Sequence, residues 1–475
     1  MFSRVMLSAV FFAMVCSGLC AAKVRTWTDV DGRTVEAELI RTDSAGVVIR
    51  RGDGREFTLA RTRLSAGDIE YLSAQAGPGG GANDAAASWV AAVNEALGLE
   101  LFADGSLWDD EPAAVAARLR LRPESVTSGA ESWRYYASPA VTVLGVPAYM
   151  LALRSEDGRL ADFTVMFTNR GDFPAFARRG RRAEISKAEI AEFGAVMLRD
   201  FSSARKALVA AMPGAELALT PALRREYPGE LAVFGAGDHV LVLQVLSEQM
   251  LTLRVRPSTR SAASRLSDDQ LRQRLKARVT RRENGDVVID QIPMVNQGPK
   301  GYCVPATFER MLRYAGIPAD MYELAAQGGT GFGGGTNVDE LVDALGRTVR
   351  QAGRRLESFR VEPAPAALAK YIDEGRPVLW SLASTPEFNE FANTYSDSRP
   401  EATAALKEWA ALRKSPSAGL SRDPQASHLC LLIGYNRTTG ELAFSDSWGP
   451  RFAERWVPAV AVQQVSFGRF WVLGF

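Results

Sequence analysis

A cysteine stands just after a loop of glycine, proline and lysine, near the start of the last third of the sequence. The segment reads Gln297-Gly-Pro-Lys-Gly-Tyr-Cys303-Val-Pro305, and apolar residues then recur at helical spacing up to Gly316. Proline suits the first turn of a helix, where its missing N–H is no loss. The spacing therefore predicts Cys303 at a helix N-terminus, where the dipole and free backbone N–H groups lower the pKa of a thiol.

A thiolate nucleophile needs a base, and the base needs a group that orients it. His428 opens an apolar run that predicts a buried strand, and Asp446 follows the next predicted strand, Glu441–Ser445. If the two strands pair as antiparallel neighbours, these side chains come within reach of each other. Asp446 would then accept from one imidazole nitrogen, and the other nitrogen would take the proton of Cys303. We predict a Cys/His/Asp site for acyl transfer.

Two further residues complete the predicted site. Gln297 lies in the loop ahead of the helix, where its side chain can donate to a developing oxyanion together with the backbone N–H of Cys303. Trp448 follows Asp446 by two positions and is expected to shield the His–Asp pair from water. This chemistry uses no cofactor and no metal ion, and we predict neither.

Three ordered motifs carry a family resemblance. They are Gln297 with Cys303 after five residues, His428 with Gly434-Tyr435 after five residues, and Asp446-Ser-Trp-Gly449. This order resembles the papain-like cysteine peptidases and covers residues 287–475. In that family Gln forms the oxyanion hole, Cys is the nucleophile, His is the base, and Asn or Asp is the third member. The resemblance thus implies a papain-like α+β domain that hydrolyses peptide bonds in a peptide or protein substrate.

The details are more similar to the bacterial branch related to double-glycine leader peptidases. Asp446 in third place and the short cysteine helix support this branch. The chain departs from papain at Gly301-Tyr-Cys303-Val-Pro, where papain has Gly-Ser-Cys-Trp. It also shows no transporter segment, so a role in bacteriocin export does not carry over.

Other functions fit the same residues. A transamidase or other acyltransferase would use the same triad, with an amine in place of water. A catalytically inactive papain-fold binding module, or a structural surface protein, would not use it. Reaction with an alkylating reagent separates the active classes from the inactive ones, because only an activated Cys303 reacts fast.

Composition sets the broad class. The chain has 475 residues, of which 47% are hydrophobic and 23% are charged, and its formal net charge is +1. These values are ordinary for globular protein, and the length predicts two to four domains. Nothing in the charge favours nucleic acid or a membrane surface as a partner. We predict an α+β multidomain fold.

The first 22 residues are typical of a secretory signal. Arg4 precedes the apolar run Val5–Val15, and small residues follow up to Ala22. We therefore expect export, with cleavage after Ala22 and no integral membrane segment afterwards. The pattern Leu-small-small precedes neither Cys16 nor Cys20, so we expect no lipid anchor. Cys303 and Cys430 are the only other cysteines, which argues against a disulfide framework.

Short alternating strands separated by Asp-Gly turns follow the signal. The pattern Trp27-Thr-Asp29, Asp31-Gly-Arg33, Leu64-Ser, Asp68-Ile and Tyr71 resembles the SLA-homology domain, a small SH3-like barrel of secreted bacterial proteins. The resemblance implies a module that binds a protein or a cell surface. The predicted order along the chain is a signal peptide at 1–22, the SH3-like domain at 23–75, a flexible linker at 76–84, an α+β domain at 85–258, a linker helix at 259–286 and the papain-like domain at 287–475.

Three stretches have less certain roles in the predicted architecture. Residues 85–258 carry no catalytic constellation, and an inhibitory pro-segment is one role that the sequence leaves open. The run Gly328–Gly335 contains a nominal G-x-G-x-x-G, but no predicted strand precedes it, so we interpret it as a loop bordering the cleft. The long segment Thr385–Ala426 is either a lid over the site or a surface excursion.

Overall fold

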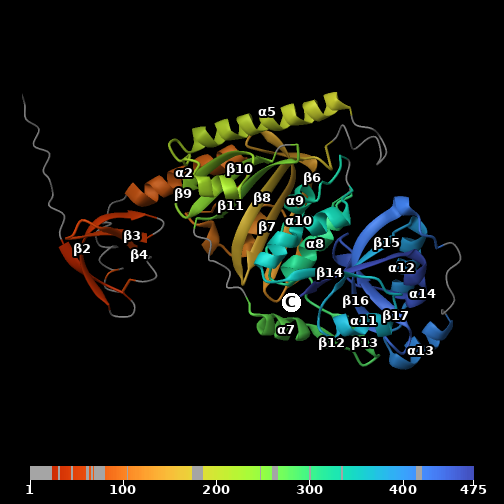
Figure 1. Ribbon diagram of the computed structural model, residues 1–475. Coiled ribbons are helices and arrows are strands. Elements are labelled where there is room, and N and C mark those ends of the chain that lie inside the picture. Colours follow the sequence, from red (N-terminus) through yellow and green to blue (C-terminus); the bar gives the residue numbers. More distant parts are fainter. Residues whose placement is uncertain are drawn as a thin grey trace, which may run out of the picture. The chain divides into compact units, whose positions relative to one another are not determined.

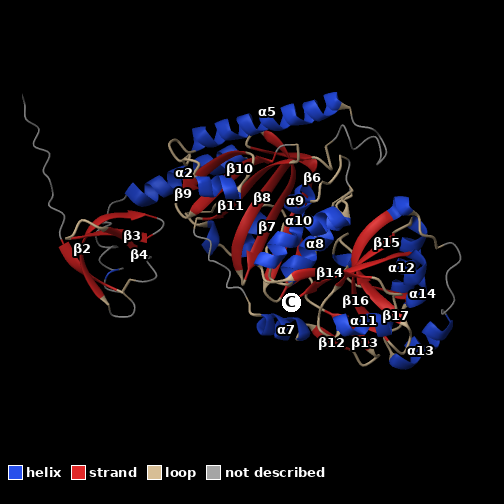
Figure 2. Ribbon diagram, viewed as in Figure 1, coloured by secondary structure: helices blue, strands red, loops and turns tan. Residues whose placement is uncertain are grey.

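The computed structural model places most of the chain in two compact units, divided between Ala82 and Asn83. Figure 1 shows the order of the elements and Figure 2 their types. The predicted signal peptide lies outside the described residues. The structure describes residues 24–29, 33–43, 46–59, 64–65, 68, 81–103, 105–173, 186–246, 248–258, 266–298, 301–332, 335–412 and 420–475.

The first unit is a four-stranded antiparallel sheet. Its strands are paired in chain order: β1 (Val24–Thr28), β2 (Thr34–Asp43), β3 (Gly46–Arg51) and β4 (Glu56–Leu59). Trp27, Val47, Ile49 and Leu64 are buried against one another and form its small core. The predicted strands are confirmed, while the SH3-like identity and the binding role stay predictions.

The second unit begins with a segment built on a seven-stranded antiparallel sheet, which we call the middle segment (residues 83–258). Its strand order is β5-β6-β7-β8-β11-β10-β9. The strands are β5 (Arg122–Thr127), β6 (Ala130–Val143), β7 (Val146–Glu156), β8 (Arg159–Asn169), β9 (Glu230–Ala236), β10 (His239–Leu246) and β11 (Met250–Pro257). The helices are α2 (Gly81–Leu97), η2 (Leu107–Asp109), α3 (Pro112–Arg118), α5 (Lys187–Ala211) and α6 (Pro221–Glu226).

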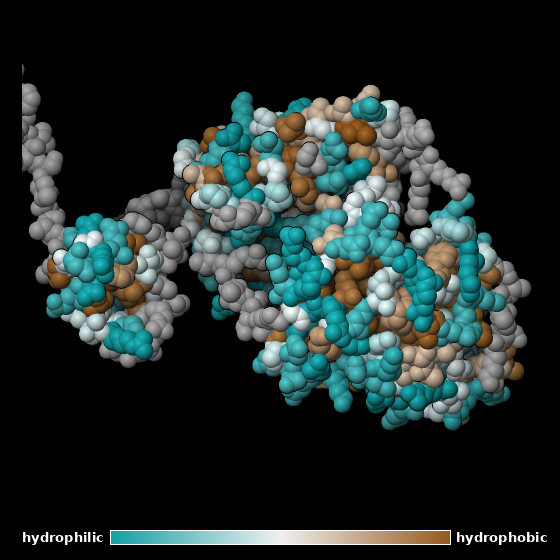
Figure 3. Space-filling model, in the orientation of Figure 1, coloured by the Kyte–Doolittle hydropathy of each residue, from teal (hydrophilic) through white to brown (hydrophobic). Residues whose placement is uncertain are grey.

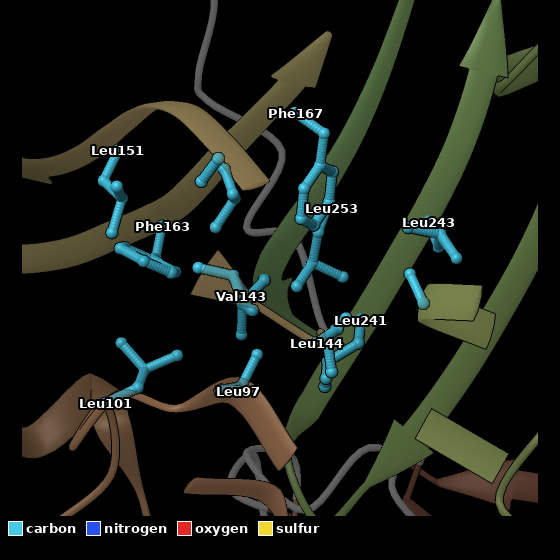
Figure 4. Close-up of a cluster of buried hydrophobic side chains, with 14 of the residues drawn as sticks. Leu97, Leu101, Val143, Leu144, Leu151, Phe163, Phe167, Leu241, Leu243 and Leu253 are labelled. Carbon is cyan, nitrogen blue, oxygen red and sulfur yellow. The ribbon is translucent and has the colours of Figure 1, made fainter. Parts of the chain in front are cut away.

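Alternating residues of this sheet face two different cores. Leu151 and Leu153 of β7 belong to the core beneath α2, α3 and α5, which Figure 4 shows from within. Met150 and Ala152 of the same strand belong to a second core, on the opposite face. Because successive side chains of a strand point to opposite faces, β7 is buried on both sides. Residues 81–84, expected in the linker, form the first turn of α2.

The remaining part of the unit, which we call the C-terminal segment (residues 266–475), has an eight-stranded sheet. Its main order is β12-β13-β16-β15-β19-β14, with β17 paired to β16 and β18 paired to β17. The strands are β12 (Val279–Arg281), β13 (Asp286–Ile289), β14 (Arg355–Phe359), β15 (Val378–Ala383), β16 (Ser427–Asn436), β17 (Glu441–Ser445), β18 (Arg455–Pro458) and β19 (Ser466–Gly474).

Helices cover both faces of this sheet (Figure 2). They are α7 (Asp268–Lys276), α8 (Cys303–Tyr314), α9 (Met321–Gln327), α10 (Val338–Gln351), α11 (Pro365–Ile372), α12 (Pro386–Ser398), α13 (Thr403–Leu412) and α14 (Ala459–Val465), with the short turns η3 (Pro424–Ala426) and η4 (Pro450–Phe452). The predicted α+β class is confirmed at this level. The predicted linker helix is α7, and its Leu271 and Leu275 pack into the core of the C-terminal segment.

Helix α8 is buried on nearly every side, because both sheets contribute to its surroundings. Phe308 and Met311 pack with residues of the eight-stranded sheet. Ala306 packs in the second core, the one that contains Met150 and Ala152 of the seven-stranded sheet. Its charged residues are buried too: Glu309 is 0% and Arg310 1% exposed. Glu309 pairs with Arg313 at 3.2 Å, so the buried carboxylate has a cation beside it.

The segment Thr385–Ala426 is fixed to the sheet by a buried ion cluster. Arg399, at the end of α12, donates to Asp286 at 2.6 Å and to Glu441 at 2.9 Å. Both carboxylates are 0% exposed. Burial alone would raise the pKa of Asp286, but hydrogen bonds from Arg399 and Asn436 hold it below its usual value. The cluster therefore joins the insertion to β13 and β17.

Replacing Arg399 with methionine is expected to lower the free energy of unfolding by about 3–5 kcal/mol, because it leaves two buried carboxylates without their cation. Urea titration at neutral pH measures this change. The control is Arg451→Met, since Arg451 is 75% exposed and lies 3.8 Å from an exposed Asp397, and its loss should stay within about 0.5 kcal/mol. Equal midpoints for both variants would contradict the structural role of Arg399.

Candidate active site

Cys303 is the first residue of α8, as the sequence predicts. Tyr302 is the N-cap, and the helix ends before Gly316, whose φ of +78° suits a residue without a side chain. The Cys303 side chain is 6% exposed. In the next turn the hydroxyl of Thr307 donates to the carbonyl of Leu429 at 3.0 Å. This bond ties α8 to β16, the strand that carries the histidine.

His428 and Asp446 meet at the ends of two paired strands. β16 and β17 are antiparallel, with Leu431 opposite Ser445, so Asp446 lies just beyond β17 and near the start of β16. His428 Nε2 lies 2.6 Å from Asp446 Oδ1. Asp446 therefore takes one ring nitrogen of His428, and Nδ1 is left for the thiol of Cys303. The structure brings these three predicted residues together.

Burial and charge act in opposite directions on this group. Burial alone would raise the pKa of the Cys303 thiol, but the charge of His428 and a hydrogen bond with it lower that pKa below its usual value. Burial alone would lower the pKa of His428, but the negative charges of Asp446 and Cys303 raise it to about 10. Both shifts favour the pair of thiolate and imidazolium over the pair of neutral thiol and neutral imidazole.

Gln297 is joined to Ser447, the residue after Asp446, and this contact determines the orientation of its side chain. The hydroxyl of Ser447 donates to Gln297 Oε1 at 2.7 Å, and the Gln297 N–H donates to the Ser447 carbonyl at 2.8 Å. With Oε1 occupied, the amide nitrogen of Gln297 is the end that can donate to an oxyanion. Ser447 stands within the Asp-Ser-Trp-Gly motif, but the motif gave no signal for this contact.

Asp446 has a second partner that sequence reasoning missed. Arg455 donates to Asp446 Oδ2 at 2.7 Å, and both side chains are almost fully buried. Its other nitrogen, Nη1, donates to Asn393 at 3.1 Å and to Asn389 at 3.3 Å, both in α12. Burial alone would raise the pKa of Asp446, but His428 and Arg455 lower it. The carboxylate is thus kept ionised and held at both oxygens.

Trp448 lies beside the pair, as predicted. Its ring centroid is 5.0 Å from that of His428, with an angle of 35° between the rings. The guanidinium carbon of Arg455 lies 5.3 Å from the centroid of the Trp448 ring. The indole therefore contacts the imidazole that it was expected to shield.

A cavity of about 180 Å³ opens onto the thiol. It is lined by Gly301, Cys303, Val304, Gly335, Thr336, Val338, Ser381, Ser427 and His428. Gly335 is the last residue of the glycine-rich run, for which the sequence predicts a loop at the cleft, and Thr336 follows it. The Gly335 N–H donates to the Gly301 carbonyl at 3.1 Å, so this loop is joined to the cysteine loop. Helix α9, not a strand, precedes the run.

The other titratable groups do not add to the site. His239 is fully buried in the middle segment, where its Nε2 accepts from the Leu107 N–H at 3.0 Å. Cys430 is fully buried in β16, and burial raises its pKa well above the usual value. In the described part of the chain, no cluster of three or more His, Cys, Asp or Glu side chains is placed to hold a metal ion.

The described surface is mixed in its hydropathy. Hydrophilic residues are spread over much of the face in Figure 3, with hydrophobic groups between them. No helix within the described ranges is long and apolar enough to cross a bilayer.

A cysteine at the N-terminus of a buried helix, facing a sheet that carries a His–Asp pair, is an arrangement of the papain-like class. Residues 289–470 match the family model described as Peptidase_C39 like family. This match supports a C39-type papain-like peptidase domain in the C-terminal segment, and with it a function of the cysteine peptidase type. A comparison with curated proteins finds no match for the chain.

The two thiols are expected to react very differently with iodoacetamide. Cys303 lines the cavity and has a lowered pKa, whereas Cys430 is enclosed and has a raised one. At pH 7 we expect Cys303 to be labelled about 100-fold faster or more. Its rate should fall in acid as the thiolate takes up a proton, and change again near pH 10, where His428 loses its proton. Mass spectrometry of the labelled peptides measures both rates, and equally slow labelling would contradict an activated thiol.

Proposed function

We propose that the chain is an exported cysteine peptidase that hydrolyses peptide bonds. Cys303 is the nucleophile, His428 the proton carrier and Asp446 the residue that orients it. Gln297 and the backbone N–H of Cys303 are the oxyanion donors. The observation that carries the proposal is the 2.6 Å contact of His428 with Asp446, made by an imidazole that also interacts with the Cys303 thiol at a cavity.

The geometry supports a two-step reaction. The Cys303 thiolate attacks the carbonyl carbon of the scissile bond, and the carbonyl oxygen becomes an oxyanion that receives hydrogen bonds from the two donors. The imidazolium of His428 then gives its proton to the leaving amine, the C–N bond breaks, and a thioester remains. Water next loses a proton to His428 and attacks the thioester. The C–S bond breaks and the acid product leaves. Cys303 is then a thiolate again, and His428 is an imidazolium that holds the proton taken from water.

Asp446 takes no proton in this scheme. Its lowered pKa keeps it ionised at neutral pH, and its two oxygens are occupied by His428 and Arg455. The carboxylate can therefore fix the orientation of the ring and stabilise the imidazolium without itself being protonated. Arg455 in turn links this carboxylate to α12, in the long insertion.

Incubation with a fluorogenic peptide library tests the proposal. Purified protein is expected to release fluorophore, and mass spectrometry in ¹⁸O-labelled water should show one label in each new carboxylate. Added amine separates hydrolysis from transfer, since a transamidase would give amide products and little labelled acid. The absence of any turnover, together with slow labelling of Cys303, would contradict the peptidase and favour an inactive binding module.

A further inference from the structure

We infer that the middle segment (residues 83–258) positions the two oxyanion donors, and is therefore a working part of the active site. This inference rests on the proposed function of the C-terminal segment. The two segments lie within one compact unit, so the contacts between them belong to a single structure. Three groups of contacts carry the inference: along an edge strand, on both sides of Gln297, and at Tyr302.

The chain that leads to Gln297 runs beside β5, the edge strand of the seven-stranded sheet. An edge strand has unpaired hydrogen-bonding groups on its free side, and here side chains and backbone of β5 and the turn after it meet the incoming segment. The hydrogen bonds are Ser128 N–H to Gln291 Oε1 at 2.6 Å, Met294 N–H to Ser125 Oγ at 2.9 Å, and Asn296 N–H to Glu124 Oε1 at 2.7 Å.

The residues on both sides of Gln297 contact the middle segment, Asn296 through hydrogen bonds and Gly298 through packing. The Asn296 carbonyl accepts from the hydroxyl of Tyr136 at 2.6 Å, in addition to the bond from its N–H to Glu124. Gly298, the next residue, has a φ of +74°, and a side-chain carbon there would lie 2.9 Å from the Tyr136 ring. Such close packing leaves Gln297 little freedom to move.

Glu124 is itself rigidly held. Its side chain is buried, and its carboxylate accepts from Arg134 at 2.6 Å and from the hydroxyl of Ser132 at 3.0 Å. Both partners come from β6, the neighbouring strand. A buried carboxylate with all of these partners transmits the position of the sheet to the Asn296 backbone.

The second oxyanion donor is fixed through Tyr302. The peptide bond between Tyr302 and Cys303 carries the Cys303 N–H. The hydroxyl of Tyr302 donates to Asn169 Oδ1 at 2.6 Å and accepts from the Gly171 N–H at 3.0 Å. Tyr302 is 2% exposed and packs in the second core, with Met150 and other residues of the seven-stranded sheet. The side chain that anchors this peptide therefore ends in the middle segment.

The same segment leaves the cavity open. All of the residues that line it lie between Gly301 and His428, so within the described part of the chain the middle segment contributes none of its wall. An inhibitory pro-segment would occupy the cleft. The described residues of the middle segment instead contact the loop that carries the donors, and so support that loop.

Replacing Tyr136 with phenylalanine tests the inference in the full chain. This change removes the hydroxyl that Asn296 accepts from and retains the ring that packs on Gly298. We expect kcat to fall about 10-fold, the effect of one lost hydrogen bond, with KM unchanged within about two-fold. The matched control is Tyr135→Phe, because Tyr135 is the preceding residue on β6 and packs in the core on the opposite face. Its kcat should stay at the wild-type value.

Two further measurements separate positioning from loss of structure. Iodoacetamide labelling needs the thiolate but no oxyanion hole, so Tyr136→Phe should label at the wild-type rate. Gln297→Ala should lower kcat by about 10²–10³-fold, and adding Tyr136→Phe to it should have little further effect, since both act on one donor. These outcomes support the inference.

Other outcomes overturn it. A kcat for Tyr136→Phe equal to that of Tyr135→Phe would show that the contact does not position the donor. Parallel loss of kcat, labelling rate and thermal stability would show a structural role only. A different variant tests the proposed function itself. If Cys303→Ala retained turnover, the proposed function would be wrong, and this experiment needs no variant of the middle segment.

Discussion

Cys303→Ala is expected to lower peptide turnover by about five to six orders of magnitude, because it removes the atom that forms the thioester. The substitution removes one sulfur atom at a position that lines a cavity, so the fold should be retained. Turnover is measured with a fluorogenic peptide selected from the library, at enzyme concentrations high enough to detect a very small residual rate. Circular dichroism and the thermal midpoint check that the variant is folded.

Cys430→Ala is the matched control for this experiment. Cys430 is fully buried in β16, two residues after His428. The same substitution of cysteine by alanine can therefore be made close to the site. Its turnover should remain within a few-fold of the wild-type value, although its stability falls slightly through the small cavity that the change creates. Comparable loss of turnover in both variants would show that packing near β16 matters and that Cys303 is no nucleophile.

His428→Asn is expected to reduce turnover by about four orders of magnitude or more, because no side chain is left to carry the proton. It should also slow the labelling of Cys303 at neutral pH about 10- to 100-fold. The positive charge of His428 lowers the pKa of the thiol in the wild type, so without it the pKa rises and the thiolate is scarce at pH 7. Arg455 still neutralises Asp446, which keeps the buried carboxylate paired.

The pH profile of labelling identifies the cause. In His428→Asn the rate should climb with pH until it approaches that of an ordinary thiolate, because the remaining obstacle is the proton on sulfur. The wild type should reach its plateau at a lower pH than the variant, because His428 lowers the pKa of the Cys303 thiol. If the variant and the wild type had the same profile, the imidazole would not be the group that activates Cys303.

Local sequence patterns predicted the elements that carry the site. Helix α5 begins at Lys187 because Ser186 and Glu189 form a capping box at its start. The cysteine helix begins at Cys303 and stops before Gly316 for equally local reasons, proline in the first turn and a residue with positive φ at the end. The pairing of β16 with β17 followed from a short hairpin between two apolar runs.

The contacts that tune the site were beyond such patterns. Ser447 and Arg455 act on Gln297 and Asp446 through the tertiary fold, and a serine or an arginine near a motif carries no signal of its own. The Asn389 and Asn393 side chains that hold Arg455 come from an insertion more than 60 residues earlier in the chain. Only the folded arrangement shows that this insertion supports the Asp446 carboxylate.

The contact between the two sheets was also invisible in the sequence. Glu124 and Arg134 are charged residues in strands, a pattern that usually indicates a solvent face. Both are buried because they pair with each other beneath the loop that leads to Gln297. Glu309 and Arg310 of the cysteine helix are buried as well, although charged side chains usually face water.

The enclosure of α8 has a consequence for motion. Backbone amides in an element covered on all sides exchange with deuterium only when a large part of the fold opens. We therefore expect the amides of residues 304–312 to be among the last in the chain to exchange. A sulfur carried by such an element is held stationary, so any adaptation to differently shaped substrates falls to the surrounding loops.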